Sequence, residues 1–374
     1  MISRTLDKMC NITTGKLDAN QAVPAGAFPF YTCAQHPDTI DSFAFDDDVV
    51  LVAGNNANGN FHVNRYNGKF NAYQRTYVLT AKQGACIDYV YYVLKLELRR
   101  LKERAQGSQT KFLTMPILTG INFNDIDFDA QKEISQVLAS IDKKIELNNK
   151  INAELEAMAK LIYDYWFVQF DFPDASGKPY KSTGGKMVYN EALKLEIPEG
   201  WDSEYIENLL AKEPRNKKLP KTHYKDQGDY AIIDQSTDFI CGYTDDKDTV
   251  IEAKVPRIVF GDHTRILKLL SFDFARGADG TQVLLSNNNN VPQHFFYHSL
   301  LKIDLSSYGY ARHFKFLKQT RTIVPDSNTA NQFEEAATSF YSQVSQNIFE
   351  TKKLEELRDW LLPMLMNGQV RVKS

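Results

Sequence analysis

Apolar residues recur at alternating steps of four and three positions along two stretches of the chain. The first series is Ile134, Leu138, Ile141, Ile145, Asn148, Asn152, Leu155, Ala159, Ile162 and Trp166. The second series is Phe333, Ala337, Phe340, Val344, Asn347, Thr351, Leu354, Arg358, Leu361 and Leu365. This spacing is the seam of a heptad repeat, and it predicts two long helices of about 35 to 40 residues each.

Both series become polar at corresponding positions. Asn148 and Asn152 in the first series stand where Asn347 and Thr351 stand in the second. Polar residues in such a seam cost stability and fix the register of paired helices. Two interpretations are open: two unrelated amphipathic helices, each packed on its own domain, or two helices that pack on each other along their length. The step-for-step match favours the second.

Short motifs outside the helices also occur twice, in the same order and about 200 residues apart. The pairs are "VVLVAGN" with "RIVFGD", "TYVL" with "TQVL", and "TKFLT" with "FKFLK". Strand character marks "DSFAFDDDVVLVAG" and "QRTYVLTAKQ", whereas "IDYVYYVLKLELRRLKERA" and "PQHFFYHSLLKI" have helical patterns. The order is therefore globular part, helix, globular part, helix.

Composition agrees with two folded domains. The chain has 374 residues, which exceeds the size of one ordinary core. No apolar run reaches the ~18 residues that span a bilayer, and the N-terminal segment lacks the apolar stretch of a signal peptide, so we expect a cytoplasmic protein. The four cysteines form no C-x-x-C pair and are expected to stay reduced. The net charge of −3 gives no sign of nucleic acid, but phosphate binding needs only a basic face.

Motifs for catalysis are absent from the sequence. It contains no P-loop, no G-x-S-x-G, no G-x-G-x-x-G before a helix, and no Asn/Asp-Pro-Pro-aromatic motif of adenine methyltransferases. Glu252 and Lys254 match the tail of some nuclease motifs, but no upstream partner is placed for them. His294 and His298, four residues apart, could share a helical face, but no acidic third ligand lies nearby, so we expect a surface or packing role and not a metal site. We predict a protein that is not an enzyme.

Polar and basic loops supply a surface that could read DNA. Asn and Gln can pair with an adenine edge, Arg with guanine, and small hydroxyls and Lys with phosphates. The predicted DNA-binding residues of the first half are Asn55, Asn58, Asn71, Tyr73, Gln74, Arg75, Ser108, Gln109, Thr110 and Lys111. Those of the second half are Arg276, Gln282, Arg312, His313, Lys315 and Lys318. Ordinary surface turns remain the alternative for each loop taken alone.

An aromatic segment, "YDYWFVQFDFP", ends the first long helix, where Pro173 and a turn-rich stretch stop it. Its aromatic residues could pack the helix end against the next domain or anchor a protein partner. The residues predicted for partner docking are Tyr165, Trp166, Phe167, Phe170, Phe172, Trp360, Leu361 and Leu365.

Several longer stretches resemble the specificity subunits of Type I restriction–modification enzymes. They are the central junction from "YDYWFVQFDFP" to "IPEGW", the pair "ITTGKLDAN" and "YNGKFNAYQRTYVL", and the C-terminal "LEELRDWLLPMLMNGQVRV". Two features depart from the family: neither half ends in its Pro-rich segment, and the first half lacks a "GW" opening. The resemblance covers nearly the whole chain.

This resemblance implies two target recognition domains, each reading one half of an interrupted double-stranded DNA site. It also implies that the two helices form an antiparallel coiled coil with pseudo-twofold symmetry. Two methyltransferase subunits and motor-nuclease subunits would be the partners. S-adenosylmethionine, ATP and Mg²⁺ would belong to those partners, with no cofactor in this chain.

We therefore predict an α+β fold in which two α/β target recognition domains alternate with two long helices. The expected parts are 1–128 and 201–327 for the recognition domains, 129–170 and 328–374 for the helices, and 171–200 for a junction or linker. The rival interpretation is a two-headed coiled-coil scaffold that binds protein and not DNA.

Overall fold

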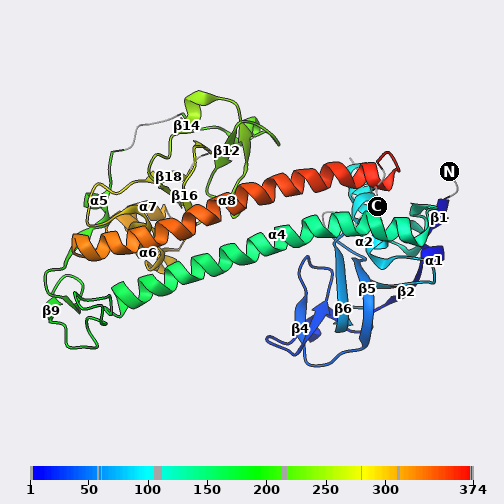
Figure 1. Cartoon of the computed structure of the whole chain (residues 1–374), viewed down its shortest axis with the longest axis horizontal. Helices are drawn as coiled ribbons and strands as arrows, with labels where there is room; N and C mark the ends of the chain where they lie inside the picture. Colours follow the sequence, from blue (N-terminus) through cyan, green and yellow to red (C-terminus); the bar gives the residue numbers. More distant parts are fainter. Residues whose placement is uncertain are drawn as a thin grey trace. The chain divides into compact units, whose positions relative to one another are not determined.

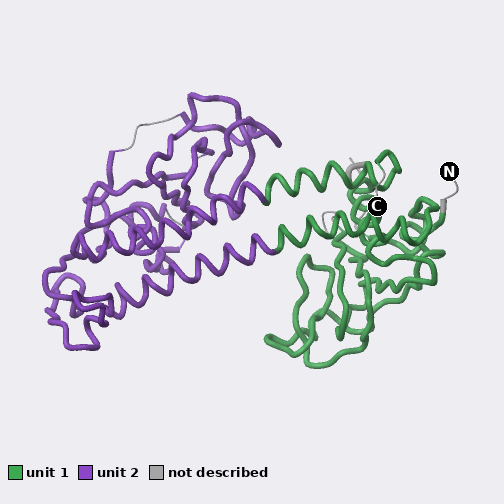
Figure 2. Tube along the Cα trace, in the orientation of Figure 1, with its two compact units in different colours: residues 1–146, 351–374 green, residues 147–350 purple. Residues whose placement is uncertain are grey.

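The computed structural model describes residues 3–56, 59, 61–104, 112–212, 217–278, 280–309, 312–370 and 372. The chain divides into two compact units (Figure 2): unit 1 comprises residues 1–146 and 351–374, and unit 2 comprises residues 147–350. The division cuts both long helices near their middles. Each unit therefore contains a folded head together with one end of each helix.

The two long helices are α4, Phe128–Tyr163, and α8, Ser327–Met366 (Figure 1). Their lengths of 36 and 40 residues confirm the prediction from the heptad pattern. An aspartate caps each start: the Ala130 N–H donates to Asp127 at 2.7 Å, and the Thr329 N–H donates to Asp326 at 3.0 Å. Such caps satisfy backbone donors that have no partner in the first turn. A π-helical turn, η2 (Asp164–Val168), follows α4.

The helices are paired within each unit, as the seam predicts. In unit 1 Arg358 forms an ion pair with Asp142 at 2.9 Å. In unit 2 the Asn148 amide donates to Glu350 and the Asn347 amide donates to Asn152, both at 2.8 Å. Because rising numbers on α4 meet falling numbers on α8 in unit 2, the pairing there is antiparallel. The polar seam positions bond across the helix pair, which favours one register.

The head of unit 1, here the first head, is built on a six-stranded sheet in the order β2-β7-β5-β6-β3-β4. One face, with Val50, Val52 and Leu79, packs against Val90 and Leu94 of helix α2. The opposite face forms a smaller cluster around Phe70. The strands are β2 Cys10–Thr14, β3 Phe28–Tyr31, β4 Asp38–Ile40, β5 Phe45–Ala53, β6 Val63–Ala72 and β7 Thr76–Ala81, and α2 is Ile87–Arg104.

A second, smaller sheet joins the beginning of the first head to its end. Strand β1 (Ser3–Thr5) pairs antiparallel with β8 (Asn122–Asn124), just before α4 begins. The short helices α1 (Leu6–Met9) and α3 (Met115–Thr119) lie beside this pair in the chain. The side chains of Leu362, Leu365 and Met366 from the end of α8 belong to the same core. Unit 1 is thus completed by the last turns of α8.

The head of unit 2, here the second head, contains two small sheets instead of one large sheet. Their orders are β13-β12-β17-β14 and β16-β15-β18. The strands are β12 Tyr230–Ile233, β13 Gly242–Thr244, β14 Val250–Ile251, β15 Arg257–Gly261, β16 Leu267–Leu270, β17 Phe274–Arg276 and β18 Thr281–Leu284. The helices are α5 Ile206–Leu209, α6 Gln293–Leu301 and α7 His313–Lys318.

The second head repeats a frame found in the first: a strand pair just before the long helix, and a four-residue helix after the first strand of that pair. Strand β11 (Asp202–Tyr205) pairs antiparallel with β19 (Arg321–Val324) immediately before α8, as β1 pairs with β8 before α4. In both heads a four-residue helix follows the first of these strands. This repeat, together with the paired long helices, confirms the predicted α+β class.

The segment 171–200, predicted as a junction or linker, is folded against unit 2. It forms the hairpin of β9 (Met187–Asn190) and β10 (Leu195–Pro198). Phe172 stacks on Trp201 with ring centroids 5.0 Å apart, and Ile197 is buried. The turn-rich composition therefore marks tight turns inside a packed segment.

Candidate nucleic-acid and partner interfaces

Four of the predicted DNA-binding residues of the first half lie around the turn between β6 and β7. Gln74 and Arg75 are exposed, whereas Tyr73 and Asn55 are half-buried. The Gly54 N–H donates to the Arg75 carbonyl at 2.8 Å, and a Cβ at Gly54 would lie 2.3 Å from that oxygen. Only glycine permits this approach, which places Asn55 beside the turn.

Phe112 completes this edge of unit 1, although it is not among the residues predicted from the sequence. Its ring is 55% exposed and lies under the Arg75 guanidinium, 5.8 Å from ring centroid to Cζ. Asn55 and Phe112 form an isolated β-bridge. An exposed aromatic inside the "TKFLT" motif was the available signal. The edge offers the Arg75 cation, the amides of Asn55 and Gln74, and the face of the Phe112 ring. The Gln74 amide donates to Asp18 at 2.7 Å.

Asn71 does not join that edge, contrary to the prediction. It is 4% exposed; its amide nitrogen donates to the Ser42 carbonyl, and its side-chain oxygen accepts from the Ala72 N–H. Both ends of the carboxamide are therefore engaged inside the head. Asn58, Ser108, Gln109, Thr110 and Lys111 lie outside the described residues.

In unit 2, Arg276 is held inside the second head. Its guanidinium donates from Nε to the Thr281 carbonyl at 2.9 Å, and Nη2 bonds the same oxygen. Burial lowers the pKa of this group. Arg276 thus joins β17 to the start of β18, which contradicts its predicted role in DNA binding. Gln282 on β18 is half-buried.

The short helix α7 divides the remaining predicted residues between surface and core. Arg312 and Lys315 are exposed, and Lys318 lies over the Phe314 ring at 5.5 Å. His313 is 2% exposed, and its two ring nitrogens lie 3.0 Å from the Asp262 and Gly309 carbonyl oxygens. His313 anchors the helix and cannot reach DNA in this fold. The cations of α7 remain candidates for phosphate contacts.

The aromatic segment after α4 is mostly core. Phe167, Phe170 and Phe172 are buried in the hydrophobic cluster of unit 2, and Leu365 is buried in unit 1. Their burial contradicts direct docking by those four side chains. Tyr165 and Trp360 are exposed, while Trp166 and Leu361 are half-buried. The predicted partner surface is therefore reduced to its outward-facing members.

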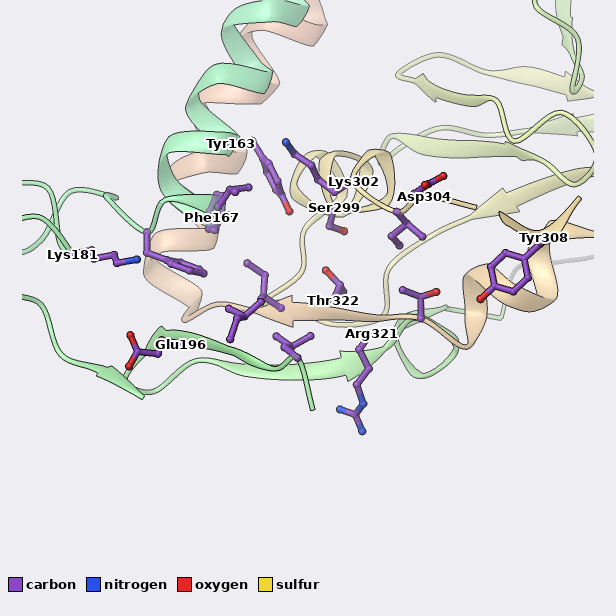
Figure 3. Close-up of a pocket in the computed structure, with 17 residues that line it drawn as sticks. Tyr163, Phe167, Lys181, Glu196, Ser299, Lys302, Asp304, Tyr308, Arg321 and Thr322 are labelled. Atoms are coloured by element: carbon purple, nitrogen blue, oxygen red, sulfur yellow. The ribbon is translucent and has the colours of Figure 1, made fainter. Parts of the chain in front are cut away.

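A groove of about 810 Å³ opens in unit 2 beside this aromatic segment (Figure 3). Tyr163 reaches it from the end of α4, Phe167 from η2, Glu196 from β10, and Lys302 from the residue after α6. Lys302 and Lys160 both pair with Asp164. Burial acts to raise the pKa of Asp164, but the hydrogen bonds and charges of these two lysines hold it below its ordinary value.

An exposed apolar stripe occurs on each long helix, outside the seam. At the end of α4 it comprises Met158 and Leu161, continued by Tyr165 in η2; on α8 it comprises Leu357 and Trp360, with Met364 half-buried at the next position. Leu161 is 68% exposed and Trp360 is 56% exposed. When the two seam series are aligned, each member on α4 and η2 falls opposite one member on α8, so the stripe is duplicated. Apolar residues off the heptad seam were the available sequence signal; of the stripe members, only Tyr165 and Trp360 were among the residues predicted for partner docking.

The structure also places the residues considered for chemistry. His294 and His298 are buried: His294 Nδ1 lies 2.8 Å from Glu334, and the Tyr341 hydroxyl lies 3.1 Å from His298 Nε2. Of the two predicted roles, surface or packing, their burial shows packing. Glu252 and Lys254 are exposed and pair with each other at 3.2 Å.

Neither a metal site nor a membrane-crossing helix occurs in the described part of the chain. No group of three or more His, Cys, Asp or Glu side chains is arranged to hold a metal ion there. Among those same residues, no helix combines the length and apolar character that a membrane crossing requires.

Fold and surfaces together define a two-headed α+β protein in which each head packs with one end of each long helix. Residues 2–157 match the family described as the Type I restriction modification DNA specificity domain. The resemblance of the chain to Type I specificity subunits is thereby confirmed, and the first half carries the matching domain.

Similar proteins extend this result. The Type I restriction enzyme EcoDI specificity subunit of Escherichia coli is 32% identical over 217 residues, which are 58% of this chain and 44% of that protein. The chain thus spans less than half of the length of that relative. The MjaIX specificity subunit of Methanocaldococcus jannaschii is 25% identical over 78% of this chain and 71% of its own.

A solved structure shares the fold. The crystal structure of a Type-I restriction-modification system S subunit from M. genitalium aligns with a TM-score of 0.64 over 98% of this chain and 96% of that chain. Its sequence identity is 16%, so the likeness concerns the fold alone.

Proposed function

We propose that the chain is the DNA-reading specificity subunit of a Type I restriction–modification system. Each head reads one half of an interrupted site in double-stranded DNA, and the paired helices set the gap between the halves. The observation that carries this proposal is the repeated frame: the head-and-helix plan of residues 3–163 recurs in residues 202–366. The part of the chain that matches the family, residues 2–157, thus has a counterpart of similar plan in the second half.

Exposed cations and polar side chains support DNA as the ligand. Arg75, Arg312 and Lys315 are exposed outside the cores of their heads. Arg75 can pair with two acceptors of a guanine, and the α7 cations suit phosphate oxygens. The rival scaffold function needs none of these groups.

The duplicated stripes support two identical protein partners. We assign the stripe around Leu161 and the stripe around Trp360 to two methyltransferase subunits, one on each. Motor-nuclease subunits complete the restriction complex. S-adenosylmethionine, ATP and Mg²⁺ act in those partners, and this chain contributes binding and no catalytic step. Because its ligand is cellular DNA, the proposal includes a cytoplasmic location.

The DNA assignment is tested by titrating salt against binding of the purified chain to duplex DNA. Phosphate contacts release counterions, so the logarithm of affinity should fall linearly and steeply with the logarithm of salt concentration. Methylome sequencing of a host that carries this chain and a methyltransferase should reveal one motif made of two short words and a fixed gap. Salt-independent or undetectable DNA binding would favour the scaffold.

The partner assignment is tested by Leu161→Glu and Trp360→Glu, alone and together. Each single substitution places a charge in one stripe and should remove one of two bound methyltransferase subunits, as counted by native mass spectrometry. The double variant should bind none. Asn149→Glu adds the same charge at an exposed position of α4 outside the stripe and should keep both partners bound. Full occupancy of the double variant would exclude the stripes as docking sites.

A further inference from the structure

The two small sheets of the second head follow the strand order of the single sheet of the first head. Around β5 the order is β7-β5-β6, and around β15 it is β18-β15-β16, with antiparallel pairing throughout. In the first head β3 is antiparallel to β4 and parallel to β6; in the second head β12 is likewise antiparallel to β13 and parallel to β17. Strand β6 therefore corresponds to β16 and β17 together, and the heads can be compared position by position.

Two backbone hydrogen bonds hold together the edge of the first head that carries Arg75. The Gly54 N–H donates to the Arg75 carbonyl, and the Gly54 carbonyl accepts from the Leu113 N–H at 2.9 Å. Asn55 follows Gly54 in the chain, and Phe112 precedes Leu113. These bonds therefore bring the side chains of the edge together from three separate segments.

The same two bonds recur in the second head around Asp262. Its N–H donates to the Gly280 carbonyl at 2.7 Å, and its carbonyl accepts from the His313 N–H at 2.9 Å. His263 and Arg312 flank this second bond, because one follows Asp262 and the other precedes His313. The equivalent bonds define three pairs of corresponding positions: Asn55 with His263, Phe112 with Arg312, and Arg75 with Gly280.

The second edge carries the same kinds of groups as the first, at exchanged positions. Asn55 and His263 are both half-buried, and a carboxamide and a neutral imidazole each offer a donor and an acceptor. The cation of the first edge is Arg75, whose guanidinium lies 5.8 Å from the Phe112 ring. In the second head the cation is Arg312, at the place of that ring. Because the two positions are neighbours, the edge keeps one guanidinium in both heads.

Arg312 is the arginine of this edge that is available to a ligand. It is exposed, and within the described part of the chain its guanidinium has no ion pair or hydrogen bond. Arg265, on the turn between β15 and β16, instead donates to the Leu305 carbonyl at 3.4 Å. Arg276 donates to a carbonyl of its own head as well. A guanidinium without an internal acceptor is suited to acceptors on another molecule.

We propose that His263 and Arg312 read bases of the second half-site, as Asn55 and Arg75 read bases of the first. This inference rests on the proposed function and assigns the reading residues of the second head. Arginine pairs with the N7 and O6 acceptors of guanine in the major groove, so the word read by the second head contains a G·C pair opposite Arg312. The His263 imidazole contacts the neighbouring base pair.

The first experiment replaces one residue of the second edge with its counterpart from the first. The chain with His263→Asn is expressed together with its methyltransferase partner, and the methylome of the host is sequenced. One position of the second word should change towards adenine, because a carboxamide pairs with two groups of that base. The first word and the gap should stay as in the parent. Arg75→Ala identifies the first word, since only that word should be relaxed.

The second experiment measures binding of Arg312 variants to duplex DNA by fluorescence anisotropy. Arg312→Ala should weaken binding to the intact site roughly tenfold to a hundredfold, and should have little effect when the G·C pair of the second word is already changed. Arg312→Lys keeps the charge without the planar fork and should lose part of that preference. Lys247→Ala is the control, because it removes an exposed cation of η4 (Lys247–Thr249) and should leave the preference for both words unchanged.

The contrary outcomes separate this inference from the proposed function. Unchanged words with a folded His263→Asn variant, in a host where the parent shows two words, would overturn the reading role of His263 alone. An equal loss of affinity for all duplexes in the Arg312→Ala variant would make Arg312 a phosphate contact and overturn its assignment. A parent methylome without a two-word motif would reject the proposed function and this inference with it. Thermal unfolding of each variant checks that the fold is kept.

Discussion

The two heads share a frame but differ in what the frame encloses. Each begins with a strand that pairs with the strand preceding its long helix, and each helix is capped by an aspartate. Inside this frame the first head has one six-stranded sheet and an 18-residue helix, whereas the second has two small sheets and a nine-residue helix. The frame is fixed by contacts with the long helices, and the interior can vary without disturbing them.

Trp201 makes the second frame more dependent on aromatic packing than the first. It is buried against Phe167 and Phe172, and its indole N–H donates to Asp326 at 3.0 Å. Trp201→Ala should cost about 3–5 kcal/mol of stability, from the cavity and the lost bond. Hydrogen exchange should show faster exchange in β15 of unit 2 and little change in β5 of unit 1. Equal acceleration in both strands would break the distinction between the frames.

The two heads also differ in one arginine each: Arg75 is exposed in the first head, whereas Arg276 bonds inside the second. Arg75→Ala should weaken binding to DNA by about 1–3 kcal/mol when its half-site is intact, and by much less when that half-site is changed. Arg276→Ala should lower the thermal stability of the second head instead, because its guanidinium bonds the Thr281 carbonyl. Fluorescence anisotropy with a panel of changed sites measures the first effect. A base-specific loss in the Arg276 variant would reverse these roles.

The two aspartate caps should respond similarly to removal, and Asp326 should also respond to pH. Burial acts to raise the pKa of Asp326, but hydrogen bonds from Thr329 and Trp201 hold it below the ordinary 3.8. Its stabilising contribution is therefore present above pH 3.8 and is lost as the pH falls through the lower folded-state value.

Asp326→Ala should cost about 1 kcal/mol at pH 7, and the difference from the parent should shrink in acid. Asp127→Ala is the matched change at the other cap and should cost a similar amount at pH 7. Urea unfolding at pH 7 and below pH 3.8 measures both. A difference for Asp326→Ala that stayed constant into acid would show that the ionised carboxylate does not carry the effect.

Lys315 provides the smallest expected effect. Lys315→Ala removes one exposed cation of α7 and should reduce the salt slope of DNA binding by about 1, for every sequence alike. Lys225→Ala is the comparison, because that ammonium already pairs with Asp245 at 2.7 Å and should contribute less. Identical salt slopes for the Lys315 variant and the parent would remove α7 from the phosphate contacts.

The sequence predicts the frame better than it predicts the interfaces. Heptad spacing is a local periodicity of the sequence, so it predicts both long helices and the polar positions of their seam. The motif pairs "VVLVAGN" with "RIVFGD" and "TYVL" with "TQVL" also correspond in structure, since β7 pairs with β5 and β18 pairs with β15. "TKFLT" and "FKFLK" do not correspond fully, because the second is α7 and its counterpart α3 begins at Met115.

Interfaces were harder to predict because residue type does not reveal burial. Asn71, Arg276 and His313 carry groups that could contact DNA, yet each bonds a backbone group of its own head. The aromatic segment after α4 was ambiguous for the same reason, and three of its phenylalanines proved to be core. Such internal partners come from distant parts of the chain and leave no local pattern.

One contact of unit 1 limits when the first head can finish folding. Its hydrophobic core contains Leu362, Leu365 and Met366, although the rest of that core ends at Leu138. A ribosome adds about 5–20 residues per second, so these side chains emerge roughly 10–40 s after the head that they cover. During that interval the apolar surface of the first head stays open to water and to chaperones. The first head, which is made before the second, is therefore among the last parts of this chain to finish folding.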